Sequence, residues 1–170
     1  MAMSDSNKHR VGMRKVVRVT PTLETSEYAQ NDLLINSTEI PDAVAYNGAC
    51  SRLVGFGLID YSDQTLLDFN IRFTKKQQNF GTRNAGVTIS DADLKTAELL
   101  GHYTVDSSSF DIDNINSQSV VYTNTGTAEI GEIYLQADTN STSCYFTVEM
   151  TSSAITYAAD SLEFWFMIEY

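Results

Sequence analysis

A chain of 170 residues with 42% apolar side chains is long enough to fold as one domain with its own core. Its net charge of −11 disfavours free nucleic acid as a ligand, and no apolar run is long enough to cross a bilayer. Cys50 and Cys144 stand far apart in sequence, and we expect two buried free thiols.

The charge is divided unevenly along the chain. Residues 1–18 carry a net charge of +4, whereas residues 19–170 carry −15. We therefore expect a basic N-terminal arm over residues 1–18 that contacts an acidic partner or a neighbouring copy, followed by a domain over residues 19–170. A solvated tail without a partner is the alternative. The basic side chains of the arm are Lys8, Arg10, Arg14, Lys15 and Arg18.

Apolar runs separated by polar turns follow the arm. Residues 15–21 predict a strand that Pro21 ends or places at an edge, and residues 36–41 predict a turn. The clearest early pattern is an apolar run at residues 53–59, a polar stretch at 60–64, and alternating apolar and polar side chains at 67–73. We expect these two runs to form a β-hairpin.

The middle of the chain predicts one helix between two loops. Residues 75–83 are polar and basic, which indicates an exposed loop around Phe80. Residues 90–100 predict the only substantial helix, with Ser90 as the N-terminal cap and Gly101 as the C-terminal cap. A strand at 102–105 and a long loop at 106–119 are expected next.

Further strands complete the chain, at residues 120–123, 130–136, 144–150 and 162–170. In the last of these, Trp165 and Met167 lie on the face opposite the core residues, so apolar surface is left for a partner. About eight strands and one short helix predict an all-β fold, an antiparallel β-sandwich or jelly roll. Its expected core includes Phe69, Ile71, Phe146, Phe164 and Phe166.

The sequence indicates no enzyme. No Gly-x-Ser-x-Gly motif is present, and His9 and His102 stand beside no evident nucleophile. We therefore expect no catalytic residue and no cofactor. The paired carboxylates of a glycan-cleaving enzyme stay open, because 22 acidic residues offer many pairs and a sequence gives no distances.

Two binding patterns are weak. Residues 111–114 begin like a calcium loop, but Asn116 and Tyr122 stand where that loop needs Gly and Glu, so no metal is expected. A group of aromatic side chains could stack on sugars, although strands are rich in aromatics anyway. These are Tyr122, Tyr134, Tyr145, Tyr157 and Trp165.

Five fragments carry a resemblance to a known group of proteins. In their order along residues 17–170, they resemble small virion proteins of tailed bacteriophages, which are common in marine phages and described as structural or capsid-associated. The basic arm is longer than in that group. The fragments are residues 19–28 (VTPTLETSEY), 31–34 (NDLL), 37–44 (STEIPDAV), 84–93 (NAGVTISDAD) and 155–162 (ITYAADSL).

The resemblance implies a non-enzymatic bacteriophage virion protein, made in the host bacterial cytoplasm and located on the capsid surface. The expected role is that of a decoration or cement protein that binds the major capsid protein, as a homo-oligomer and by the resemblance a trimer. The alternative is a head-fibre or tail-associated protein that binds a receptor or glycan. The residues expected to contact the capsid or another partner are Lys8, Arg10, Arg14, Lys15, Arg18, Trp165 and Met167.

Overall fold

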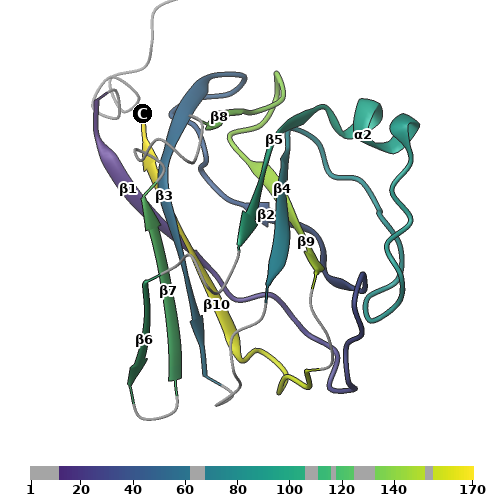
Figure 1. Cartoon of the computed structure of the whole chain (residues 1–170). Helices are drawn as coiled ribbons and strands as arrows, with labels where there is room; N and C mark the ends of the chain where they lie inside the picture. The colour runs from purple at the N-terminus through teal and green to yellow at the C-terminus, as the bar shows by residue number, and fades with distance from the viewer. Residues whose placement is uncertain (1–11, 62–67, 106–110, 116–117, 125–132, 152–154) are drawn as a thin grey trace, which may run out of the picture.

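The computed structural model describes residues 12–61, 68–105, 111–115, 118–124, 133–151 and 155–170. They form two antiparallel sheets that pack face to face, so the predicted all-β sandwich is confirmed (Figure 1). The six-stranded sheet contains β1 (Arg14–Val19), β3 (Cys50–Asp60), β6 (Asp111–Ile115), β7 (Gln118–Asn124), β8 (Ile133–Gln136) and β10 (Leu162–Glu169). The four-stranded sheet contains β2 (Leu33–Ile40), β4 (Phe69–Thr74), β5 (Leu99–Val105) and β9 (Cys144–Met150).

The strands pair in a nested order. β1 pairs with β10, β2 with β9, β3 with β8 and β4 with β5, all antiparallel. β10 also pairs with β3, and β9 with β4, which joins these pairs into the two sheets. This is the connectivity of a jelly roll. The strands β6 and β7 extend it, because β7 pairs with the second half of β3 while β8 pairs with the first half.

The core lies between the two sheets. The five side chains predicted to be core are all confirmed, each at most 3% exposed: Phe69, Ile71, Phe146, Phe164 and Phe166. The Phe146 ring lies at the centre, with its centroid 4.9 Å from that of Phe166 and 5.2 Å from that of Phe164. Strict alternation along β4, β9 and β10 is what directs these side chains to one side.

The predicted hairpin is wrong, although both of its strands exist. β3 and β4 lie in different sheets and do not pair with each other. β3 and β4 thus bury their core side chains from opposite sheets, and residues 62–67 between them lie outside the described part of the chain. Alternation reports which face of a strand is buried, but it carries no information about the partner strand.

Two other predicted loops contain strands. β2 continues through the expected turn at residues 36–41 as far as Ile40, with irregular register against β9. β6 occupies residues 111–115 of the expected loop at 106–119. In β2 the polar side chain of Asn36 forms hydrogen bonds with residues outside the strand. Asn36 Nδ2 donates to Asn79 Oδ1 (2.7 Å) and to the Gly81 carbonyl oxygen (2.8 Å).

The helix α2 (Asp91–Ala97) begins as predicted and ends earlier. Ser90 is the N-terminal cap and forms a capping box with Asp93. The chain leaves the helix at Glu98, which has a φ of 53°, while Gly101 lies within β5. The backbone N–H groups of Lys75 and Lys76 bond to the carbonyl oxygens of Glu98 and Ala97 (3.1 and 3.0 Å). The left-handed Glu98 therefore ends the helix before the expected glycine, and the two lysine N–H groups satisfy carbonyl oxygens at that end.

The segment of residues 75–98 lies on the outer side of the four-stranded sheet (Figure 1). Phe80, expected in an exposed loop, is fully buried, and so is Thr147 on the outer side of β9. We call this covered surface the loop-covered face.

No helix in the described ranges is long and apolar enough to span a membrane.

Candidate functional site

The predicted contact residues fall mostly on two neighbouring strands. Arg14, Lys15 and Arg18 lie in β1, and Trp165 and Met167 lie in β10, its antiparallel partner. Lys8 and Arg10 lie outside the described residues. The last five residues of the predicted arm, 14–18, therefore belong to the six-stranded sheet.

One cluster surrounds Trp165. The Arg18 guanidinium carbon lies 4.5 Å from the centroid of the Trp165 ring, close enough for a cation–π contact. The indole Nε1–H donates to Glu163 Oε1 (2.7 Å), and the same oxygen accepts a hydrogen bond from Arg18. The Arg18 side chain is still 55% exposed, so the cluster presents a guanidinium to solvent above an aromatic ring.

A second cluster surrounds Glu169 and joins three strands. Glu169 Oε1 accepts from Arg14 Nε of β1 (3.2 Å), and its Oε2 accepts from Arg52 of β3. These two hydrogen bonds hold the pKa of the Glu169 carboxyl below its usual value, that from Arg52 contributing most. The Arg14 side chain is 72% exposed. This cluster therefore presents a second guanidinium at the surface.

Apolar surface lies between the two clusters. Val16 is 51% exposed and stands opposite Met167 in the register of β1 and β10. In β3, Gly55 pairs with Met167 and Gly57 with Trp165, so no side chain rises beside them there. We call this surface the β1–β10 face: Arg14, Val16, Arg18, Arg52, Glu163, Trp165, Met167 and Glu169.

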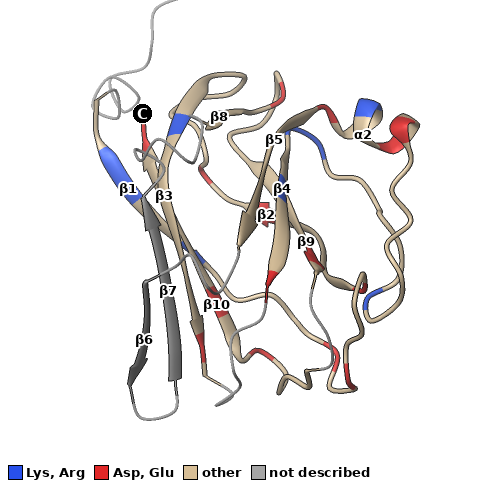
Figure 2. Ribbon diagram, in the orientation of Figure 1, with Lys and Arg blue, Asp and Glu red and all other residues tan. Residues whose placement is uncertain are grey.

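Lys15 does not join this face. Its neighbours in the strand, Arg14 and Val16, point outward, and Lys15 instead pairs with Asp42 (Nζ–Oδ2, 3.0 Å). All three cations predicted in β1 are thus engaged with acidic side chains of the same chain. Figure 2 marks the basic positions along the ribbon of β1 in blue. Arg52 was not anticipated, because it stands alone in the apolar run of β3 and no sequence signal links it to residue 169.

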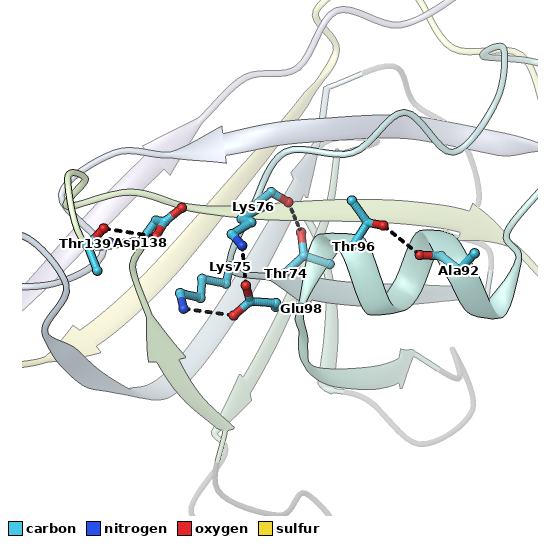
Figure 3. A network of polar contacts seen from close by, with 8 residues as sticks. All are labelled: Thr74, Lys75, Lys76, Ala92, Thr96, Glu98, Asp138 and Thr139. Atoms are coloured by element: carbon cyan, nitrogen blue, oxygen red, sulfur yellow. Dashed lines mark hydrogen bonds and ion pairs between the residues drawn. The ribbon is translucent and has the colours of Figure 1, made fainter.

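On the segment that covers the loop-covered face, two lysines share one carboxylate. Lys75 Nζ bonds to Glu98 Oε2 (2.8 Å), and Lys76 bonds to the other oxygen of the same carboxylate (Figure 3). Hydrogen bonds from these two lysines lower the pKa of Glu98 to about 2. The network fastens the end of α2 to the chain that leaves β4.

The remaining candidates are dispersed. Tyr157 is buried and Tyr134 is 55% exposed, so the aromatic residues do not form a common sugar platform; the Tyr122 side chain lies outside the described part. Cys144 is buried as predicted, and burial raises the pKa of its thiol to about 12. Cys50, expected to be buried, is exposed.

Within the described ranges, no three His, Cys, Asp or Glu side chains are grouped to hold a metal ion. Residues 111–115, which begin like a calcium loop, form β6, and their side chains are not described.

Comparison with protein-family models and with curated proteins finds no match to this chain.

Proposed function

We propose that this protein is a bacteriophage virion protein that decorates the outer capsid shell as cement. In this proposal the β1–β10 face is the surface that attaches to the major capsid protein. Copies bound to the lattice would brace adjacent capsomers against the pressure of the packaged DNA. The resemblance of the five ordered fragments supports the class of protein, and the jelly roll, which occurs in viral capsid domains, agrees with it at the level of fold.

The observation that carries the choice of surface is the composition of the β1–β10 face. Val16 and Met167 form an apolar centre, and Arg14 and Arg18 flank it with exposed guanidinium groups. Arginine, tryptophan and methionine are the residues enriched in protein interfaces, which have an apolar core and a polar rim. Lys8 and Arg10 precede β1 in the sequence and would extend the contact.

A capsid-binding assay tests this surface. Particles stripped of the protein are incubated with the purified chain, and bound protein is measured after sedimentation. We expect Val16→Glu to abolish binding, because it places a negative charge in the apolar centre. Leu99→Glu is the matched control, since Leu99 is 42% exposed in β5 of the other sheet. Equal binding of the two variants would contradict the proposal.

The arm and the sheet can be tested separately. Deleting residues 1–11 removes Lys8 and Arg10 and leaves β1 in place. We expect weaker attachment with an unchanged fold, and a further loss as salt is raised.

The proposal also includes a homo-oligomer, for which a trimer is the expectation. Light scattering should give a mass above the 18.9 kDa of one chain.

The second candidate is a head-fibre or tail-associated protein that binds a receptor or glycan. The jelly roll favours it as well, because lectin domains share this architecture. Copy number separates the two candidates: a decoration protein covers the lattice, whereas a fibre or tail protein is present in few copies. Quantitative mass spectrometry of purified virions measures that number.

A further inference from the structure

Among the described residues, two hollows on the side of the four-stranded sheet differ in their hydrogen bonding. The larger, of about 470 Å³, is polar, but its groups are already bonded within the chain. Asn36 uses its amide for Asn79, Gly81 and the N–H groups of Ser37 and Phe80. Arg83 donates to the Thr22 carbonyl oxygen and pairs with Glu24. This hollow is held by its own contacts and leaves few groups for a ligand.

The smaller hollow, of about 260 Å³, lies where the chain leaving β4 meets the turn between β8 and β9. Lys75, Lys76 and Gln77 line one side, and Asp138, Asn140 and Ser141 line the other. Tyr145 of β9 completes the wall. Figure 3 shows Asp138 beside Lys76, with Glu98 holding both lysines from below.

The charged groups of this hollow balance one another. Lys75 and Lys76 share the Glu98 carboxylate, and Asp138 lies near enough to Lys76 to raise the pKa of its ammonium further. Two ammonium groups thus face two carboxylates. Lys75, Lys76 and Asp138 line the hollow, and Glu98, which does not line it, offsets the second lysine from behind. Charges paired in this way give a free anion or cation little attraction.

Uncharged groups, by contrast, are available. Within the described residues, the exposed side-chain amides of Gln77 and Asn140 and the hydroxyl of the half-buried Tyr145 make no hydrogen bond to the chain, and all three line the hollow. Each amide offers two donors and an acceptor, and the phenol offers one donor together with an apolar ring. Neighbouring hydroxyls on a sugar ring, with their adjoining C–H face, match such a set.

We propose that this hollow binds one neutral sugar ring of a surface glycan. Its volume lies just below the range of sites for drug-sized ligands, which suits a single ring better than a chain. The proposal goes beyond capsid attachment, because the hollow and the β1–β10 face lie on opposite sides of the sandwich. Attachment by one face would leave the other turned outward.

The test uses the full chain and saturation-transfer NMR with the methyl glycosides of glucose, galactose, mannose and N-acetylglucosamine, and methyl glucuronide as a charged probe. We expect at least one neutral glycoside to bind. The double variant Gln77→Ala and Asn140→Ala should weaken it at least tenfold, and Tyr145→Phe several-fold. These side chains make no internal hydrogen bonds, so the variants should keep the fold, which circular dichroism checks.

Thr82→Ala, at the larger hollow, is the matched control and should bind as the unaltered chain does. Three outcomes would overturn the proposal: no neutral glycoside binds, the double variant binds equally well, or only the glucuronide binds. The assay contains no capsids, so its failure leaves the attachment proposal standing. Failure of the capsid assay likewise says nothing about the sugar.

Discussion

The two outer faces of the sandwich differ in how their side chains are held: one by ion pairs at the surface, the other by burial under a covering segment. In the described part of the chain, no segment covers the outer side of β1, β3 and β10 in the six-stranded sheet, and ion pairs and a cation–π contact lie across these strands. The four-stranded sheet buries much of its outer side under residues 75–98, with Phe80 and Thr147 fully enclosed. We infer that stability resides more in the covered face, while the open face can change its residues at little cost to folding.

The largest expected difference comes from apolar side chains on the two faces. Phe80→Ala should lower the free energy of unfolding by about 3–5 kcal/mol, because it leaves a cavity under the segment. Val16→Ala on the open face should change it by about 0.5 kcal/mol or less. Urea denaturation of both variants measures this. Similar midpoints would remove the distinction between the faces.

Ion pairs should follow the same order. Glu149 Oε2 pairs with Arg72 (2.5 Å), and these side chains are only 14% and 21% exposed. Glu149→Gln should cost about 1.5–3 kcal/mol, because Arg72 Nη1 is already buried without a hydrogen bond and loses a charged neighbour. Glu163→Gln on the open face should cost about 0–1 kcal/mol. A larger loss from Glu163 would reverse our interpretation.

Asn36 should matter because it ties β2 to the covering segment. Asn36→Ala removes hydrogen bonds to Asn79, to Gly81 and from the Phe80 N–H, and should cost about 1–3 kcal/mol. Asn140→Ala is the control, since that amide makes no such bond in the described part of the chain. Thermal unfolding compares the two. Equal melting temperatures would mean that these hydrogen bonds do not hold the segment.

The smallest expected effect depends on pH. The folded pKa of Glu98, about 2, lies below the ordinary value of 4.5, so its ion pairs stabilise the fold above pH 4.5. That contribution is lost as pH falls from 4.5 towards 2. NMR titration of the Glu98 carboxyl should show a midpoint near 2, and Lys75→Met should raise it. A midpoint near 4.5 in the unaltered chain would contradict the network.

How far the sequence predicts this structure differs between elements. β9 and β10 could be predicted closely because their alternation is a local property that burial enforces residue by residue. The partners of β3 and β4 could not, since both sheets bury one side of each strand alike. The end of α2 was missed because the left-handed cap is Glu98, a residue type that carries no such signal, and because Lys75 and Lys76, which bond to carbonyl oxygens there, lie far from it in sequence.

The candidate site divides in the same way. The cations of β1 and the apolar residues Trp165 and Met167 are visible in the sequence as residue types, but their proximity on two paired strands is not, because β1 and β10 lie at opposite ends of the chain. The ion pairs of these cations were not visible, because Glu163 and Glu169 come from β10, far along the chain. The smaller hollow left no signal either, since Gln77 and Asn140 are ordinary loop residues in the sequence.

The pairing of β1 with β10 has a consequence for how the protein folds as it is synthesised. Arg14 and Glu169 are 155 positions apart, so β1 leaves the ribosome long before its partner strand is made. A fold dominated by such distant pairings forms slowly, on the order of milliseconds to seconds. While it waits, β1 is an unpaired strand, and charged side chains such as those of Arg14, Lys15 and Arg18 discourage pairing with other nascent chains. Arg14 and Arg18 thus have two roles: they oppose aggregation before folding, and they form ion pairs with β10 afterwards.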